Sequence, residues 1–114
     1  MTFGYSRNMK QDLAIDAFGA LAHGTRLAIF RLLVRRGPGG TPAMEVGRLL
    51  DLKPSTVSGH LSILKRAGLV TAQRQQREVL YAPDLETVND LVTFLLEDCC
   101  GGDETACRNI LSRG

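Results

Sequence analysis

Apolar residues recur at helical spacing in the middle of this chain. Val57, Leu61 and Leu64 are four and three positions apart, so on a helix they form a single stripe. The opposite face carries short polar residues, a glycine and a lysine: Ser55, Thr56, Ser58, Gly59, Ser62 and Lys65. Short hydroxyl side chains beside a glycine let a helix lie deep in a DNA major groove, where they bond to base edges or phosphates. The pattern predicts a DNA-reading helix over residues 54–66.

The residues around this helix predict a helix-turn-helix. Pro54 suits the first turn of the helix, and Gly68 suits the position just past its end. Before it, Thr41 is expected to cap a shorter helix that has Pro42 in its first turn. The apolar stripe of that shorter helix is Ala43, Val46, Leu49 and Leu50. Residues 51–53 would form the turn between the two helices, and such a pair with a link of about three or four residues is a helix-turn-helix.

Two β-prone runs follow, at residues 69–73 and 78–82. The link between them is polar and basic: Arg74, Gln75, Gln76 and Arg77. This is a hairpin of the kind called a wing, and its two arginines are expected to contact phosphates or the adjacent minor groove. Lys65 and Arg66 are suited to contact the phosphates that flank the major groove. His60 falls next to the buried stripe, so a packing or phosphate-contact role is expected.

Three further helices are predicted. The first starts at Met9, with one apolar face: Leu13, Ala17 or Phe18, and Leu21. The second covers residues 25–36, with His23 as its cap and the glycine-rich residues 37–40 as its end. It is apolar around most of its circumference, so it should be central to the core. The last starts at Pro83 and Asp84, and its stripe is Leu85, Val88, Leu91, Val92 and Leu95.

These elements predict a mainly α fold with a small β-hairpin, a winged helix-turn-helix, in a chain of 114 residues. Pairing the last helix with its symmetry mate and with the first helix would bury the last stripe in a two-fold dimer. We expect residues 1–8 to form a mobile N-terminus and residues 9–98 to form the DNA-binding and dimerisation domain. Residues 99–114 would form a sensor tail.

The charge distribution supports a DNA partner better than the total charge does. The formal net charge of +2 is too small to indicate nucleic acid by itself. Between residues 53 and 77, however, the chain has only basic charges: Lys53, Lys65, Arg66, Arg74 and Arg77. No apolar run approaches the roughly 18 residues of a membrane span, and no secretory signal is recognisable, so we expect a cytoplasmic protein without a membrane partner.

Three segments carry a family resemblance: LAHGTRLAIFRLL, STVSGHLSILKRAGLV and a basic hairpin that ends in REVLYA. In this order and spacing they resemble the winged helix-turn-helix repressors of the ArsR/SmtB family, over roughly residues 10–97. The resemblance implies a homodimer that binds double-stranded operator DNA and senses a metal, a metalloid or a sulfur species. Lys53 stands where many members have a capping serine, and Gly24 stands where many have proline.

All three cysteines lie near the C-terminus, at Cys99, Cys100 and Cys107. Three thiolates without a histidine favour a soft, three-coordinate centre, and trivalent arsenic or antimony fits. By resemblance, one group in the family binds trivalent arsenic with an adjacent cysteine pair and a third cysteine downstream, which is the pattern here. The cysteines are thus expected to bind As(III) or Sb(III) as inducer, and DNA binding itself should need no cofactor.

Other interpretations keep the same residues. The cysteines could form a thiol-redox or persulfide sensor, or an organoarsenical sensor with the adjacent pair alone. A zinc or cadmium sensor would recruit Asp103 or Glu104 as a fourth ligand. A winged-helix protein-interaction module without DNA binding is the remaining alternative, but it has no need of an acid-free basic segment. Neither histidine is expected to be a metal ligand, and no plausible base and nucleophile pair predicts an enzyme.

Overall fold

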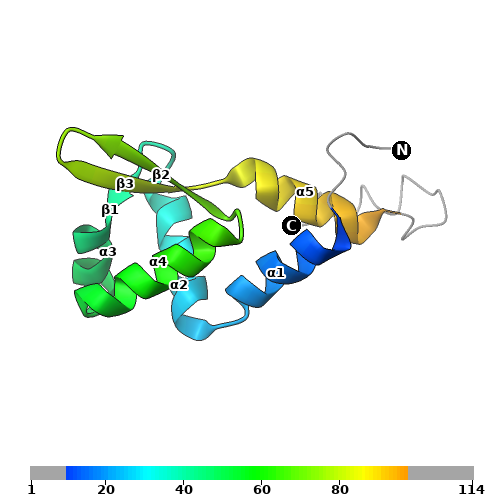
Figure 1. Ribbon diagram of the computed structural model, residues 1–114, viewed down its shortest axis with the longest axis horizontal. Coiled ribbons are helices and arrows are strands. Elements are labelled where there is room, and N and C mark those ends of the chain that lie inside the picture. Colours follow the sequence, from blue (N-terminus) through cyan, green and yellow to red (C-terminus); the bar gives the residue numbers. More distant parts are fainter. Residues whose placement is uncertain (1–9, 98–114) are drawn as a thin grey trace.

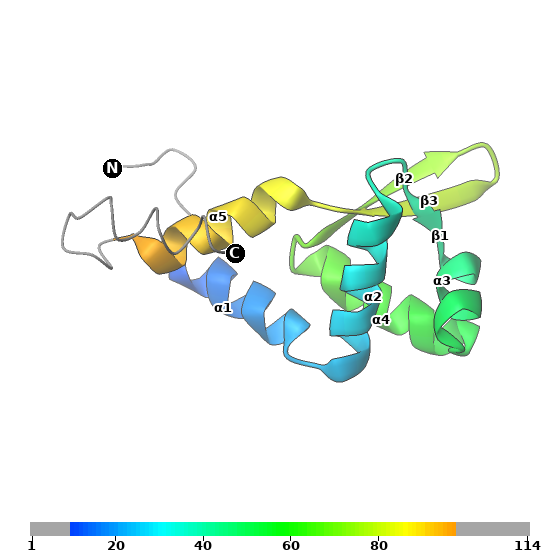
Figure 2. The same ribbon diagram turned by 180° about the vertical axis from the view of Figure 1, so that it is seen from behind.

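The computed structural model describes residues 10–97, which fold into helices and a small antiparallel sheet. The elements are α1 (Gln11–Leu21), α2 (Gly24–Arg36), β1 (Thr41–Pro42), α3 (Ala43–Leu50), α4 (Pro54–Arg66), β2 (Val70–Gln75), β3 (Glu78–Pro83) and α5 (Leu85–Leu96). In Figure 1, α2, α3 and α4 gather below the sheet at one end, whereas α1 and α5 extend to the other end. Figure 2 shows the same division from behind. The predicted winged helix-turn-helix is confirmed.

The first helix contacts the rest of the chain through alanines. Ala14, Ala17 and Ala20 are at most 5% exposed and contribute to the core. The predicted apolar face was partly wrong, because Leu13 is 57% and Phe18 37% exposed. Small side chains allow the backbone of α1 to lie close to α2 and α4. The larger apolar side chains are consequently left on the outer side of the helix.

The second helix supplies much of the core, but with one face only. Its buried residues are Ile29, Phe30, Leu32 and Leu33. The prediction that this helix is central to the core is confirmed, although Leu27 and Val34 are each 43% exposed and not all of its apolar circumference is covered. The predicted cap is confirmed, because the Thr25 N–H donates to Nδ1 of His23 over 3.2 Å. The helix ends at Gly37, whose φ of +96° favours glycine.

A two-residue strand, β1, was not predicted. Thr41 and Pro42 were expected to cap and start α3, but Thr41 pairs with Tyr81 and Pro42 with Leu80 of β3. Proline has an extended backbone here (φ −66°, ψ 150°) and serves as the N-cap residue of α3. The sheet therefore has three strands in the order β1-β3-β2. A pair of residues is too short to show the alternation by which a strand is recognised.

The hairpin is longer and its turn tighter than predicted. β2 and β3 pair over six positions, as far as Gln75 opposite Glu78. The link is thus Gln76 and Arg77 rather than four residues, and Gln76 has a φ of +57°. Arg74 lies within β2, opposite Val79, and not in the link.

The helix expected from Pro83 and Asp84 forms, but Pro83 is the last residue of β3 and Asp84 is the N-cap of α5. The Asp84 side chain accepts a hydrogen bond from the Thr87 N–H over 3.2 Å, which caps the helix. Leu91 is the buried residue of the predicted stripe, and Val88 packs against the core from its edge. Within residues 10–97 no single helix is long and apolar enough to cross a membrane, and α1 and α2 reach that length only as a pair bent by 97°.

Candidate DNA-binding surface

The recognition helix α4 is fixed more firmly at its end than at its start. Lys53, the N-cap residue, makes no side-chain capping bond. Pro54 is the first helical residue, as predicted. At the other end, the Gly68 N–H donates to the Lys65 carbonyl and the Leu69 N–H to the Leu64 carbonyl, both over 3.0 Å. Gly68 has a φ of +82°, so this is a Schellman motif, and the predicted glycine stop is confirmed.

The two faces of α4 differ as the sequence predicts. Val57, Leu61 and Leu64 are at most 1% exposed and anchor the helix in the core. On the opposite face the side chains predicted to read DNA are open to solvent: Ser55, Ser58, Gly59, Ser62 and Lys65. Thr56 is half-buried at the edge of this face. A Cβ added at Gly59 would meet nothing within 4 Å, so the packing of the fold does not require a glycine here. The missing side chain instead allows another molecule to approach the backbone of α4 closely.

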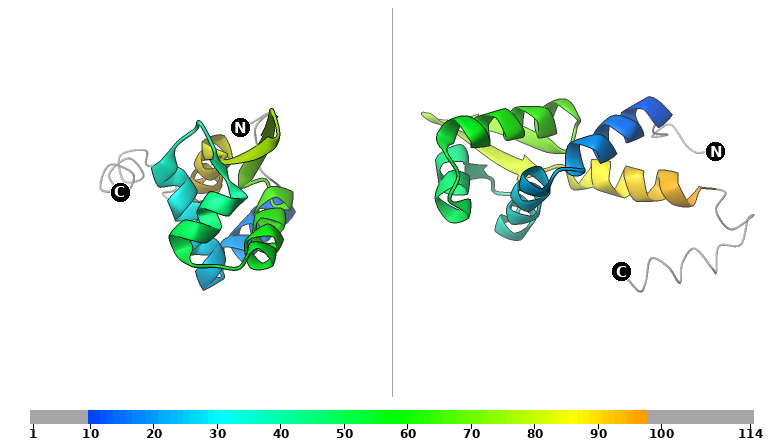
Figure 3. Two further views of the ribbon diagram at one scale, coloured as in Figure 1. Left: turned by 90° about the vertical axis from the view of Figure 1, so that its left-hand side faces the viewer. Right: turned by 90° about the horizontal axis from the view of Figure 1, so that it is seen from below.

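The wing extends the basic surface. Arg74 in β2 and Arg77 in the turn are both exposed. The left view of Figure 3 shows the hairpin and α4 on one side of the molecule and α2 on the other. Hydroxyl side chains on α4 can bond to base edges, and guanidinium groups on the hairpin can contact phosphates. No acidic residue occurs between residues 53 and 77, and exposed Glu78 at the start of β3 follows directly, so this surface is mainly basic.

A close approach holds the turn of the helix-turn-helix together. Gly47 of α3 is buried, and a Cβ there would lie 3.0 Å from the Leu52 carbonyl oxygen. The Leu52 N–H donates to the Gly47 carbonyl over 2.9 Å. Asp51 between them has a φ of +56°. The three-residue turn predicted between α3 and α4 is confirmed, and its packing fixes where α4 begins.

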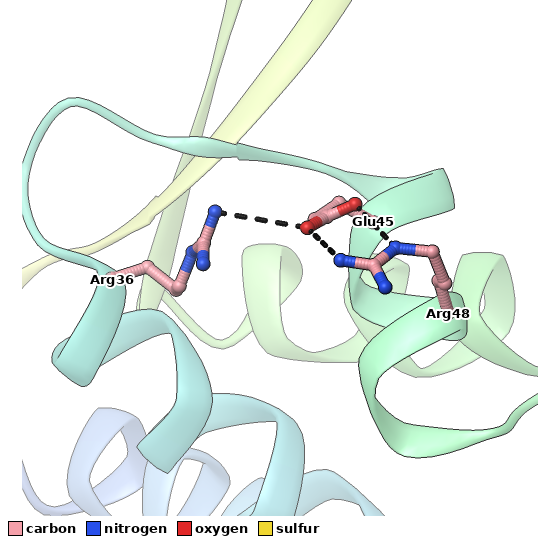
Figure 4. A network of polar contacts seen from close by, with 3 residues as sticks. All are labelled: Arg36, Glu45 and Arg48. Atoms are coloured by element: carbon pink, nitrogen blue, oxygen red, sulfur yellow. Dashed lines mark hydrogen bonds and ion pairs between the residues drawn. The ribbon is translucent and has the colours of Figure 1, made fainter.

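A carboxylate that sequence reasoning missed joins α2 to α3. Glu45 accepts hydrogen bonds from Nε and Nη2 of Arg48 over 3.0 and 2.6 Å, and Nη2 of Arg36 lies 3.8 Å away (Figure 4). The bonds from Arg48, with a smaller effect of Arg36, lower the pKa of Glu45. The three-residue spacing of Glu45 and Arg48 on one helix was the available signal. The group is exposed to solvent, so it orients side chains more than it stabilises the fold.

His60 points away from the serine face, toward the start of α2. Its Nδ1 lies 3.5 Å from Nη1 of Arg26, and its ring centroid is 4.8 Å from that of His23. Burial, and then the electrostatic effects of His23 and Arg26, lower the pKa of His60. A packing role fits this position, whereas contact of His60 with DNA stays a prediction.

The predicted sensor lies outside the described residues. Cys99, Cys100 and Cys107 all follow Glu97, the last described position, as do the alternative ligands Asp103 and Glu104. Within residues 10–97 no group of three or more His, Cys, Asp or Glu side chains could hold a metal ion. The assignment of these cysteines to a metalloid site therefore stays a prediction.

Comparison with known proteins identifies the fold and the family. Residues 21–73 match the family described as "Helix-turn-helix domain". The HTH-type transcriptional regulator YgaV of Escherichia coli K12 is 35% identical over 81 residues, which cover 71% of this chain and 80% of that protein.

Solved structures extend the likeness. A homodimeric winged helix-turn-helix DNA-binding domain from Mycobacterium bovis, a possible ArsR-family regulator, is 26% identical with a TM-score of 0.62, covering 86% of this chain and 92% of that one. A protein described as "Possible transcriptional regulator for arsenical resistance" is 25% identical with a TM-score of 0.61, covering 87% and 96%. This chain belongs to the helix-turn-helix transcriptional regulators, DNA-binding proteins rather than enzymes, and its fold is the winged helix-turn-helix of the ArsR type.

Proposed function

We propose that this chain is a homodimeric repressor that binds a pseudo-palindromic operator and releases it when trivalent arsenic or antimony is bound by Cys99, Cys100 and Cys107. The observation that supports operator binding is the face of α4 described above. It combines exposed serines with Lys65 and lies on the same side of the molecule as the basic hairpin. A helix with small polar side chains beside a basic wing suits base reading in the major groove and phosphate contacts next to it.

The dimer is supported by apolar side chains that the single chain leaves uncovered. On α1 and α5 these are Leu13, Ile15, Phe18, Leu85 and Leu95, each at least 37% exposed. Both helices extend away from the helix-turn-helix in Figures 1 and 2. A two-fold contact between these faces would bury the side chains and place two copies of α4 along one DNA duplex. The similar domain from Mycobacterium bovis is itself described as homodimeric.

The metalloid is proposed from ligand chemistry. Cys99 and Cys100 follow the end of α5 at Leu96 by three and four positions, so the thiols are linked in sequence to the proposed dimer contact. Soft thiolates suit trivalent arsenic, and three of them complete its coordination. The description of one similar protein, which names arsenical resistance, agrees with this proposal. Couplings between a ligand site and a DNA site are typically about 1 to 3 kcal/mol, and a dimer could use two.

Parallel titrations test the proposal. The full chain is bound to DNA from upstream of its own gene, and arsenite, antimonite, zinc and hydrogen peroxide are added separately. Release by arsenite or antimonite under reducing conditions is the expected result. Release by peroxide alone would indicate a thiol-redox or persulfide sensor, and release by zinc a site completed by Asp103 or Glu104. A chain that binds neither this DNA nor non-specific duplex would be an interaction module instead.

A further inference from the structure

Arg26 joins the recognition helix to the corner between α1 and α2. Its Nε donates to the Ala20 carbonyl in the last turn of α1 over 2.6 Å. Its Nη1 lies 3.5 Å from Nδ1 of His60, near the middle of α4. Arg26 itself is in the first turn of α2, so one guanidinium group connects three helices. In Figure 1 this corner lies directly below α4.

The two histidines of the chain lie side by side, with ring centroids 4.8 Å apart, and both use Nδ1 as an acceptor. The Thr25 N–H donates to Nδ1 of His23 over 3.2 Å. Arginine has only donors, so its contact with Nδ1 of His60 also requires that nitrogen to be unprotonated. Each histidine must therefore be neutral, with its proton on Nε2, for the cluster to form.

We propose that Arg26 is a positioning residue for the recognition helix and that the paired histidines make its hold on α4 sensitive to acid. Protonation of His60 would remove the acceptor of Arg26 and place a second positive charge beside it, and protonation of His23 would break its bond from the Thr25 N–H. With the rings 4.8 Å apart, protonation of both would place three positive charges together. The inference rests on DNA binding by α4, because its consequence is a change in the angle at which α4 meets DNA.

The charged surroundings favour the neutral state. The titratable and charged groups that face His60 are His23 and Arg26, both at the start of α2. Asp16 of α1 lines a surface pocket of about 350 Å³ together with Arg26 and Arg66. Burial, and then the electrostatic effects of His23 and Arg26, lower the pKa of His60. The contact between Arg26 and His60 is consequently intact at neutral pH. It weakens as the pH falls below the ordinary histidine value of about 6.5.

Asparagine provides a matched test. Its Oδ1 takes the place of Nδ1 as an acceptor and does not titrate, and asparagine also caps helices well. His23→Asn with His60→Asn removes every histidine from the chain. The affinity of the full chain for a labelled duplex from its upstream region is measured between pH 7.5 and 5.5. Wild-type affinity should fall with acid, by up to about tenfold per pH unit for each linked histidine, whereas the double variant should stay nearly constant.

Arginine variants test the positioning role at constant pH. Lysine keeps the charge of Arg26 but cannot reach both Ala20 and His60, so Arg26→Lys should weaken DNA binding about tenfold at pH 7.5. Arg31→Lys, at an exposed position of the same helix, is the control and should have no effect. Wild-type binding that strengthens with acid would show that protonated His60 contacts phosphate directly, and it would overturn the proposal. Equal pH profiles of the wild type and the double variant would overturn it as well.

A measurement without DNA separates this inference from the proposed function. In nitrogen-15 NMR spectra the signal of the Arg26 Nε–H, bonded to the Ala20 carbonyl, should shift with the same midpoint as the His60 ring. In the double variant it should stay unchanged between pH 7.5 and 5.5. If the Arg26 signal does not shift as His60 titrates, the coupling between Arg26 and His60 is disproved, even if the chain binds its operator normally. Failure to bind the upstream duplex would instead contradict the proposed function and leave this measurement valid.

Discussion

Thr41 lies opposite Tyr81 in the pairing of β1 with β3, and within the described residues its buried hydroxyl has no hydrogen-bond partner. The residue is only 1% exposed. A buried hydroxyl without a partner costs about 1 to 3 kcal/mol relative to an apolar group of the same shape. The Thr41 hydroxyl therefore does not stabilise the pairing of β1 with β3, which forms in spite of its burial.

Replacing Thr41 with valine should stabilise the fold, because valine keeps the β-branched shape and removes the hydroxyl. We expect the free energy of unfolding to rise by about 1 kcal/mol, measured by urea denaturation. Thr71→Val, at an exposed position of β2, is the matched control and should change stability little. A loss of stability in Thr41→Val would mean that the hydroxyl has a partner in solution.

The elements that the sequence predicted well are those whose own residues contain the signal. Val57, Leu61 and Leu64 have helical spacing, and Gly68 closes α4 because its position demands a positive φ. β1 was missed because its residues form a strand only through Tyr81 and Leu80, almost forty positions later. Local propensity does not contain such a distant pairing.

Side-chain surroundings were harder to predict than helices. Periodicity placed Leu13 in a buried face, but the alanines of α1 occupy the contact and Leu13 is exposed. His60 was expected beside the core stripe, and it is there, but nothing local indicates its approach to Arg26 or to His23. Both cases depend on which face of one helix meets another, which is decided by the packing of the whole domain.

Enlarging the serine face of α4 should prevent operator binding. Ser58→Trp or Ser62→Trp places a large ring on the exposed surface that would enter the major groove. Affinity for the operator should fall to the non-specific level, about 10³-fold or more weaker, in a footprinting or anisotropy experiment. Ala28→Trp, on the exposed side of α2, controls for the added ring. Normal footprints from the serine variants would show that α4 does not read the operator.

The wing should contribute charge and little sequence information. Arg77 is exposed in the hairpin turn, so Arg77→Ala should weaken specific and non-specific DNA binding alike. Each lost phosphate contact flattens the slope of log affinity against log salt by about 0.9. The slope should therefore become flatter by about one unit for each half-site that carries the substitution. Arg35→Ala, near the end of α2, should leave the slope unchanged. A loss confined to operator DNA would contradict a phosphate role.

The exposed apolar residues of α1 and α5 should hold the dimer together. Leu95 and Leu13 are each 57% exposed in the single chain. In the proposed dimer a carboxylate at either position would be buried without a partner. Leu95→Glu or Leu13→Glu should raise the dimer dissociation constant about 30-fold or more, as expected for a hot spot of about 2 kcal/mol. Met44→Glu is the control, because Met44 is 83% exposed and lies on α3. Sedimentation at several concentrations measures the effect, and unchanged dimers would place the interface elsewhere.

Serine variants of the cysteines test the metalloid site. If Cys99, Cys100 and Cys107 supply three thiolates to one arsenic atom, each Cys→Ser change should weaken the response to arsenite. Serine is a hard and weakly acidic ligand, and it does not replace a thiolate. DNA binding without inducer should remain, because the surface of α4 and the wing is unchanged.

Cys107 distinguishes arsenite from organic arsenicals. Arsenite uses three sulfur ligands, whereas a methylated or phenylated trivalent arsenical already has one carbon substituent and needs only two. Cys107→Ser should therefore reduce DNA release by arsenite more than release by a phenyl arsenical, and Cys99→Ser or Cys100→Ser should reduce both. Release is measured by anisotropy under reducing conditions, with the wild type as reference. If Cys107→Ser responds normally to arsenite, the adjacent pair is the complete site and an organic arsenical becomes the better candidate for the natural signal.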